Sequence, residues 1–250
     1  MDKRRYIKSI SLTSPIEHRS YLHSLAAVKH LQQYGQLDFN KDVTFFVGEN
    51  GTGKSTLIEA IAVAYGFNPE GGSRNFNFST CHSHSELWEH LTLAKTDYAE
   101  DGFFLRAESL YNVASNIDEL DRIPAAAPSV ISSYGGVSLH RQSHGESFLA
   151  LVQNRFGGNG LYILDEPEAA LSPMRLLTLM IEMKRLVEKN SQFIIATHSP
   201  LLMAFPNATV YEFSSDGIRE TNYQNTDHYL VTKRFLNNSE QMLKELFDEK

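Results

Sequence analysis

Residues 48–55 read Gly48-Glu49-Asn50-Gly51-Thr52-Gly53-Lys54-Ser55 and match the pattern G-x-x-x-x-G-K-[ST] of a phosphate-binding loop. The apolar run 43–47 precedes this loop, and apolar residues at helical spacing follow it. A loop of this pattern between a strand and a helix is the context in which it grips phosphates. The sequence therefore predicts that the chain binds a nucleoside triphosphate.

The loop can direct many hydrogen-bond donors into one small volume. Its glycines allow dihedrals and close approaches that a β-carbon would prevent, and its amides lie at a helix N-terminus, which favours anions. Lys54 would add a positive charge beside the β- and γ-phosphates, and Ser55 could place its hydroxyl on Mg²⁺. The predicted phosphate-binding residues are Gly48, Glu49, Asn50, Gly51, Thr52, Gly53, Lys54, Ser55 and Thr56.

Composition narrows the classes of protein that remain. A chain of 250 residues with 42% hydrophobic content can bury one core with a small additional lobe. The net charge of −7 argues against a uniformly basic nucleic-acid binder, although the basic N-terminal cluster Lys3, Arg4, Arg5 and Lys8 could touch phosphate or simply be a solvated terminus. A single cysteine excludes an intrachain disulfide, and no apolar run has the length of a membrane span. We expect a cytoplasmic protein without membrane insertion.

A second apolar run, residues 161–164, ends in Asp165 and Glu166. It has the character of a parallel strand buried on both faces, so its end would open at the same sheet edge as the phosphate-binding loop. Asp165 could then hold Mg²⁺, directly or through water, and Glu166 could orient and polarise the water that attacks the γ-phosphate. The alternative is that these carboxylates only leave the strand and cap the next turn.

A third apolar run, residues 193–196, is followed by Thr197 and His198. The helical pattern that starts at Ser172 and Pro173 connects it to the second run, which makes a βαβ unit. His198 could donate a hydrogen bond to the γ-phosphate. Only its position at the end of a buried strand distinguishes it from the other nine histidines of the chain.

The rest of the pattern indicates a single domain over residues 1–250, with residues 68–134 as an inserted lid or arm. Strands are predicted over residues 6–12, 43–47, 103–110, 210–213 and 218–223, the last two as a hairpin, with helices over residues 21–34 and 86–94 and from residue 239. Short strand character is expected at residues 75–78 and a connector at 123–128.

Residues 143–147, Ser143-His144-Gly145-Glu146-Ser147, precede an amphipathic pattern and predict a helix N-terminus that offers a hydroxyl and free amides to an anion. By itself this is a capping motif. Its distance from the carboxylate strand, 165 − 143 = 22 residues, is similar to the spacing of the signature motif in ABC-type ATPases. The chain resembles that family.

The resemblance implies a P-loop NTPase fold, with a mixed α/β core and a helical lobe. The matching segments are 48–56 as Walker A, 143–147 as the signature, 161–166 as Walker B, 169–172 as the D-loop, and His198 as the switch histidine. In this family two protomers enclose two ATP molecules with Mg²⁺. By that analogy Ser143 and Gly145 contact the γ-phosphate of the partner's nucleotide, and Glu166 and His198 are catalytic.

Within the superfamily the chain looks more like the soluble RecF/SMC/Rad50 and OLD-type ATPases, and most like small stand-alone AAA-family ATPases. Three features depart from the family pattern. His144 and Gln142 replace a glycine and the leucine of the signature, and no other glutamine lies between Walker A and the signature, so the Q-loop glutamine is missing. The interval from Gly53 to Ser143, 143 − 53 = 90 residues, is too short for a long coiled coil.

The predicted function is an ATP-binding and ATP-hydrolysing switch that dimerises. DNA repair and phage defence are the roles that we consider for it, through a nucleic acid or an effector protein. Two alternatives stay open: the nucleotide-binding subunit of a membrane transporter, and a sensor that binds nucleotide without turnover. A zinc site of Cys81, His82, His84 and His90 is a weaker alternative for the middle of the chain, because its spacing fits no standard pattern.

Overall fold

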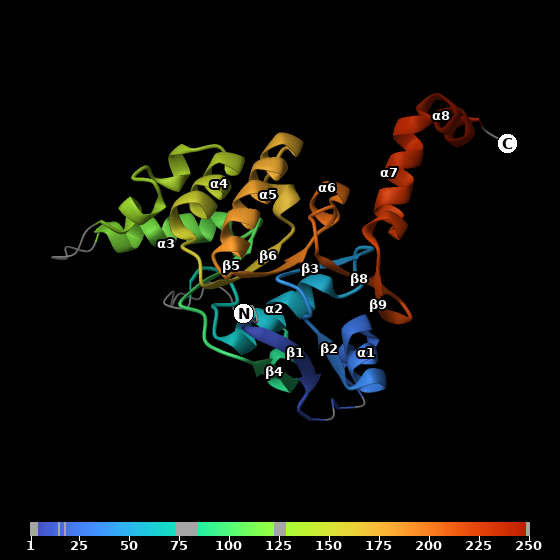
Figure 1. Ribbon diagram of the computed structural model, residues 1–250, viewed down its shortest axis with the longest axis horizontal. Helices are drawn as coiled ribbons and strands as arrows, with labels where there is room; N and C mark the ends of the chain where they lie inside the picture. Colours follow the sequence, from blue (N-terminus) through green and yellow to red (C-terminus); the bar gives the residue numbers. More distant parts are fainter. Residues whose placement is uncertain (1–4, 15, 18, 74–84, 123–128, 249–250) are drawn as a thin grey trace.

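A six-stranded sheet forms the centre of the computed structural model, which describes residues 5–14, 16–17, 19–73, 85–122 and 129–248 (Figure 1). The strand order is β5-β6-β7-β3-β8-β9, and neighbouring strands are parallel except β8 and β9. The strands are β3 Val43–Gly48, β5 Asp101–Arg106, β6 Gly160–Asp165, β7 Gln192–Ala196, β8 Thr209–Ser214 and β9 Gly217–Thr221. This arrangement confirms the expected mixed α/β core, including the hairpin of β8 and β9.

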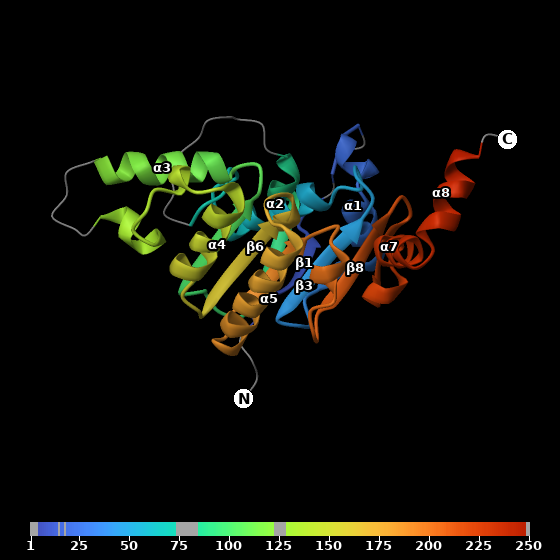
Figure 2. The same ribbon diagram turned by 90° about the horizontal axis from the view of Figure 1, so that it is seen from above.

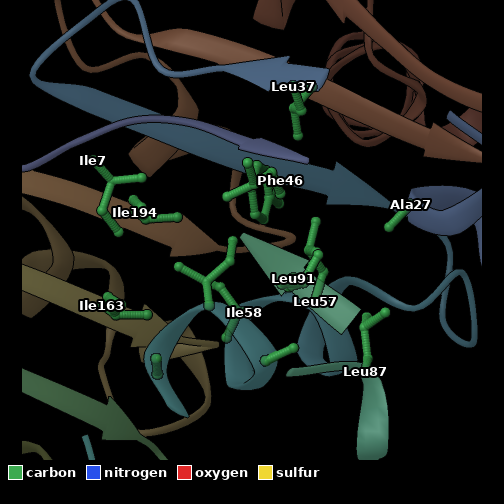
Figure 3. Packing of buried hydrophobic residues seen from close by; sticks show 14 of the residues in the cluster. Ile7, Ala27, Leu37, Phe46, Leu57, Ile58, Leu87, Leu91, Ile163 and Ile194 are labelled. Carbon is green, nitrogen blue, oxygen red and sulfur yellow. The ribbon is translucent and has the colours of Figure 1, made fainter. Parts of the chain in front are cut away.

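A smaller antiparallel sheet, with the order β2-β1-β4, lies below the large one, and α2 packs between them (Figures 1 and 3). Its strands are β1 Ile7–Leu12, β2 Gln36–Asp38 and β4 Leu91–Lys95, and the helices on this side are α1 Ala26–Tyr34 and α2 Lys54–Tyr65. Ile58 of α2 shares one buried apolar cluster with Ile7 of the small sheet and Ile194 of the large sheet. This packing fixes the start of α2 against the end of β3.

The opposite face of the large sheet is covered by a helical layer (Figure 2). Its helices are α3 Leu110–Arg122, α4 His144–Arg155, α5 Pro173–Glu188 and α6 Pro200–Met203. Successive residues of a strand point to opposite faces, so Phe46 joins the cluster around α2 while Phe45 and Val47 join the cluster under the helical layer. Burial on both faces explains the nearly continuous apolar runs of β3, β6 and β7.

Two predicted helices differ in the structure. Residues 86–94, predicted as one helix, form the 3-10 turn η2 Glu86–His90 and then β4, because the segment from Leu91 pairs with β1. The helix expected over residues 21–34 is divided at Leu25 into the 3-10 turn η1 Tyr21–Ser24 and α1. In the first case pairing between distant segments overrides the local helical preference.

The described part of residues 68–134 contributes to both sheets and to the helical layer. It supplies β4, β5 and α3, and it ends in the 3-10 turn η3 Val130–Tyr134. The strand predicted over residues 103–110 is β5, which ends at Arg106, and Leu110 already begins α3. The strand expected at residues 75–78 and the connector at 123–128 lie outside the described residues.

The C-terminal segment extends from the body beside β8 and β9 (Figures 1 and 2). It consists of α7 Asp227–Asn237 and α8 Ser239–Phe247, which we call the C-terminal arm, and all its residues are exposed or half-buried. The remaining short turns are η4 Leu139–Arg141, η5 Pro167–Ala169 and η6 Tyr223–Asn225. In the parts of the chain that the structure describes, none of the helices combines the length and apolarity needed to cross a membrane.

Candidate functional site

Three strand ends meet at one edge of the large sheet. β6, β7 and β3 are parallel neighbours, so their ends lie at the same edge. The loop after β3 therefore lies on the same side as Asp165 and Glu166 at the end of β6, and as Thr197 and His198 after β7. The register places Ala196 of β7 opposite both Phe46 of β3 and Asp165 of β6. The loop, the two carboxylates and the imidazole predicted from the sequence are therefore brought together.

Glycine is required at two positions of the loop. Gly48 has φ +137° and Gly53 has φ +89°, a region that other residues rarely adopt. A β-carbon at Gly48 would lie 2.3 Å from the carbonyl oxygen of Phe213, and one at Gly53 would lie 3.0 Å from Cδ2 of Leu25. The loop thus keeps its path because side chains are absent where β8 and the turn before α1 approach it.

Lys54 is folded back over the loop. Its side chain is buried, and its Nζ donates hydrogen bonds of 2.8 Å to the carbonyl oxygens of both Gly48 and Glu49. Burial lowers the pKa of Lys54, whereas the charges of Glu166 and Asp165 act in the opposite direction. The ammonium has three donors, so one of them stays available for a phosphate oxygen.

Ser55 and Asp165 form a pair of oxygen atoms suited to a hard cation. Ser55 Oγ donates to Asp165 Oδ1 at 3.1 Å. Burial raises the pKa of Asp165 to about 6, while the charge of Arg106 and the hydrogen bond from Ser55 oppose that shift. No cluster of three or more His, Cys, Asp or Glu side chains arranged for a metal occurs among the described residues. Mg²⁺ is commonly held by one or two protein oxygens together with phosphate and water, so the Ser55 and Asp165 oxygens could hold it.

Glu166 begins the turn after β6 with an unusual backbone. Its φ of +50° lies in the left-handed region, and its amide donates to Ala196 O at 3.0 Å. Its Oε1 is 3.5 Å from His198 Nε2, and 43% of its side chain is exposed. The carboxylate is thus held beside the imidazole and open to water.

His198 is supported from two sides. Glu168 accepts hydrogen bonds from Thr197 Oγ1 at 2.8 Å and from the amide of His198, and Nδ1 of His198 is 2.9 Å from Nε2 of His228. Burial lowers the pKa of His198, and the charges of Lys54 and His228 lower it further, against Glu166. The imidazole is therefore neutral near pH 7.

Three of the residues at this site were missed by the sequence analysis: Arg106, Glu168 and His228. Arg106 places Nε 3.6 Å from Asp165 Oδ2, and its other nitrogens bond Glu59 at 2.8 Å and Glu108 at 2.6 Å. Arg106 and His228 come from β5 and α7, far from the motifs in sequence, so no local pattern marks them. Glu168 lies three residues after Asp165 and could have been flagged as a third carboxylate at the strand end.

The predicted signature residues lie at the start of α4, apart from this cluster. Ser143 Oγ donates to Glu146 Oε2 at 2.6 Å, and the Ser143 amide donates to the same oxygen at 2.9 Å. Arg175 of α5 donates to Ser143 Oγ at 3.2 Å and to Glu146 Oε1 at 3.1 Å. A β-carbon at Gly145 would lie 2.4 Å from Arg175 Nη1 and 3.0 Å from Ala170 O. The expected free hydroxyl is therefore already bonded within the protomer.

Several expectations fall on residues that the structure does not describe. Lys3 and Arg4 of the basic cluster and three of the four residues of the alternative zinc site, Cys81, His82 and His84, lie outside the described residues. His90, the fourth, places Nδ1 3.0 Å from Ser14 Oγ. The zinc site stays a prediction.

Two protein-family models match the chain. One, described as "AAA domain", matches residues 22–103, which include the phosphate-binding loop. The other, described as "AAA domain, putative AbiEii toxin, Type IV TA system", matches residues 137–204, which include the start of α4, both carboxylates and His198. The two models together span the three strand ends that form the site.

The matches to curated relatives cover only part of each relative's length. The chain is 28% identical over 161 residues to an ABC transporter ATP-binding protein of Bacillus subtilis, YthP, a match that covers 61% of this chain and 62% of the relative. It is 26% identical over 218 residues to the ribose import ATP-binding protein RbsA of Yersinia pestis, which covers 80% of this chain and 40% of the relative. The chain thus spans about two fifths to three fifths of these proteins.

Solved structures share the fold. CbiO1 of Clostridium perfringens, part of the ABC transporter complex CbiONQ, is 17% identical with a TM-score of 0.53, over 96% of this chain and 100% of that one. An ATP-binding cassette of another ABC transporter is 13% identical with a TM-score of 0.52, over 95% and 98%. The chain has the ABC-ATPase fold of the P-loop NTPases.

Proposed function

We propose that this chain binds ATP with Mg²⁺ at the edge formed by β6, β7 and β3 and hydrolyses the bond to the γ-phosphate. The observation that carries the proposal is the convergence of four groups at the ends of three strands: Ser55 Oγ lies 3.1 Å from Asp165 Oδ1, and Glu166 Oε1 lies 3.5 Å from His198 Nε2. A nucleotide-binding loop and a water-activating carboxylate at the same edge are the parts that phosphoryl transfer requires.

The residues divide the reaction between them. The amides of the loop and Lys54 bind the phosphates, and Ser55 and Asp165 hold Mg²⁺, which when bound neutralises the charge that develops on the phosphate oxygens. Glu166 accepts a proton from water as the water oxygen bonds to the γ-phosphorus and the bond to the β-phosphate oxygen breaks. Neutral His198 donates a hydrogen bond from Nε2 to the γ-phosphate. ADP and phosphate are the products.

The proposal includes a homodimer with ATP at its interface. The hydrogen bonds of Ser143 join it to Glu146 and Arg175 rather than to the loop of its own protomer. A second copy could bring Ser143 and Gly145 at the tip of its α4 to the γ-phosphate, which would complete the site in each protomer. Binding then closes the dimer, and hydrolysis opens it again.

Two measurements test the proposal directly. The purified chain should release phosphate from ATP in the presence of Mg²⁺ and not with EDTA, and light scattering should show dimers with ATP and monomers without it. Nucleotide binding without phosphate release would instead support the non-hydrolysing sensor. Release of phosphate by a protein that stays monomeric under ATP would rule out the dimer.

A transporter subunit is the second candidate, and the relatives favour it, since YthP and RbsA are named as ATP-binding proteins of transporters. The missing Q-loop glutamine disfavours it, because that residue couples nucleotide to the membrane subunit in such proteins. Co-purification with a polytopic membrane protein would support this candidate.

A soluble role in DNA repair or phage defence is the candidate that we favour on the sequence resemblance to RecF/SMC/Rad50 and OLD-type ATPases. Phosphate release should then rise when single-stranded or double-stranded DNA or RNA is added, and the rise should weaken with salt. Equal rates with and without each nucleic acid, across salt, would argue for an effector protein instead.

A further inference from the structure

His228 links the C-terminal arm to the nucleotide edge. His228, in the first turn of α7, places Nε2 2.9 Å from His198 Nδ1, and the two rings lie 4.9 Å apart at 55°. Thr226 anchors the start of α7, since it is fully buried and its hydroxyl donates to Tyr223 O at 2.7 Å. The position of His228 is therefore set by both the body and the arm.

A cavity of about 420 Å³ separates the arm from the phosphate-binding loop. Gly48, Glu49 and Thr52 of the loop line one side, the hairpin of β8 and β9 lines another, and Asp227 and His228 of α7 close it. The loop and the start of α7 thus face each other across open space. The bond between the two histidines bridges the edge and the arm beside that space.

The direction of this hydrogen bond follows from the partner on the other side of His198. Nε2 of His198 is 3.5 Å from Glu166 Oε1 and is buried with no hydrogen-bond partner of its own. If Nε2 lacked a proton, its lone pair would face the carboxylate, and two acceptors would oppose each other. With the proton on Nε2, a neutral His198 must accept at Nδ1, so His228 must donate from its Nε2.

We infer that His228 is a positioning residue: it donates to Nδ1 of His198, keeps the proton of His198 on Nε2 where it faces Glu166, and makes the C-terminal arm follow the state of the nucleotide site. A shift of His198 toward a γ-phosphate would pull on His228 and therefore on the first turn of α7. The part of this inference that concerns ATP rests on the proposed function, whereas the protonation of the two rings does not.

Nitrogen-15 NMR of the histidine-labelled, nucleotide-free protein tests the first part. His198, assigned by comparison with His198→Gln, should show a protonated Nε2 and an unprotonated Nδ1, with a through-bond coupling from Nδ1 to Nε2 of His228. A protonated Nδ1 on His198 would overturn the assignment. This experiment needs no ATP, so its outcome is independent of whether the chain hydrolyses nucleotide.

Variants of His228 test the second part. His228→Phe keeps a ring but removes the donor, and His228→Gln replaces the donor with an amide N–H. We expect kcat for ATP to fall about two- to tenfold in His228→Phe at unchanged KM, the value of one neutral hydrogen bond, and to recover in His228→Gln. His140→Ala, which removes a ring that contacts Ser115 and Tyr111, is the matched control and should keep the wild-type rate.

Amide hydrogen exchange in α7 distinguishes coupling to the nucleotide site from a merely structural role of His228. ATP should change the exchange of the amides in the first turns of α7 in the wild type and in His228→Gln, and leave them unchanged in His228→Phe. Wild-type kcat and an ATP-dependent change in α7 in His228→Phe would overturn the inference. A wild-type protein with no phosphate release, but with the expected NMR spectrum, would refute the proposed function alone.

Discussion

The N-termini of α2, at the nucleotide edge, and of α4, at the predicted signature, have different surroundings. α2 is preceded by Gly53 at its N-cap and has no acidic residue in its first turn, and Lys54 lies over the loop before it. α4 is preceded by Ser143 at its N-cap and has Glu146 in its first turn, and this carboxylate accepts from both the amide and the hydroxyl of Ser143. Both helix ends carry the same favourable field for an anion.

The difference shows which end is prepared for a phosphate in the isolated protomer. The end of α2 is open to an anion, whereas the end of α4 already holds an anion supplied by the chain. Hydrogen bonds from Ser143 lower the pKa of Glu146, and the charge of Arg175 acts in the same direction, so the carboxylate is ionised. A phosphate of a partner protomer would have to displace this carboxylate before it could use Ser143.

Replacing Glu166 should give the largest effect, because it removes the proton acceptor and leaves both helix ends intact. We expect Glu166→Gln to lower kcat by about 100-fold or more while ATP still binds. Light scattering should then show ATP-dependent dimers that persist. A variant that hydrolyses ATP at the wild-type rate, or that stays monomeric with ATP, would contradict the role given to this carboxylate.

Replacing Lys54 tests the open end at α2. Lys54→Ala removes a buried ammonium beside the phosphates, and ATP affinity should fall on the order of 100-fold, the value of charge-assisted hydrogen bonds. Equilibrium binding of a fluorescent ATP analogue measures this effect. Lys184→Ala, an exposed lysine on α5, is the control and should bind as the wild type does.

The free energy of unfolding gives a second test of the α2 end, because the charge of Asp165 is buried there. Its pKa rises from 3.8 to about 6 in the fold, so between pH 4 and pH 6 the native state holds more protons than the unfolded chain. The contribution of this group to the free energy of unfolding therefore falls as pH rises through that window. Asp165→Asn should stabilise the nucleotide-free, Mg²⁺-free protein at pH 8 by on the order of 2 kcal/mol, measured from urea midpoints.

Asp101 offers the opposite case as a control for that measurement. Burial would raise its pKa, but hydrogen bonds from the Gly157 amide and the charge of Arg155 prevail and lower it. Its contribution is present above the unfolded pKa and is lost as pH falls through the folded pKa. Asp101→Asn should therefore destabilise the protein at pH 8. Equal shifts in both variants would show that burial of Asp165 costs nothing.

The smallest expected effect concerns the closed end at α4. Glu146→Gln keeps the shape of the side chain and removes the charge, so the ATP-dependent dimer should tighten about two- to fivefold. Sedimentation of the variant in the Glu166→Gln background measures the dimer constant without turnover. Glu188→Gln, which removes an equal charge at the far end of α5, should leave the constant unchanged. A weaker dimer in Glu146→Gln would mean that the carboxylate itself contacts the partner.

Much of the site could be predicted because its residues follow apolar strands directly. The loop follows β3, Asp165 ends β6 and His198 follows β7, and each of these strands is a buried apolar run that can be recognised in the sequence. Parallel strands end at a shared edge, so sequence order alone places these groups together. Distances between them, such as that from Glu166 to His198, needed the structure.

The misses have physical causes. Residues 86–94 looked helical, yet strand pairing with β1 decides their form. α3 carries Leu110, Val113 and Ile117 at helical spacing, so the sequence does contain a pattern that predicts this helix. α7 has no buried face, so no apolar pattern marks its contact with the site, and His228 was therefore not identifiable from the sequence.

The backbone conformation of Glu166 lowers the stability of the fold, whereas its side chain is needed for the proposed ATP hydrolysis. A glutamate held at φ +50° carries a strain of about 1–2 kcal/mol that glycine would avoid and asparagine would reduce. Selection for heat resistance alone would thus favour exchanging this residue for one that cannot accept a proton from water. A library sorted only for folded protein should accumulate inactive, more robust chains changed at this single turn.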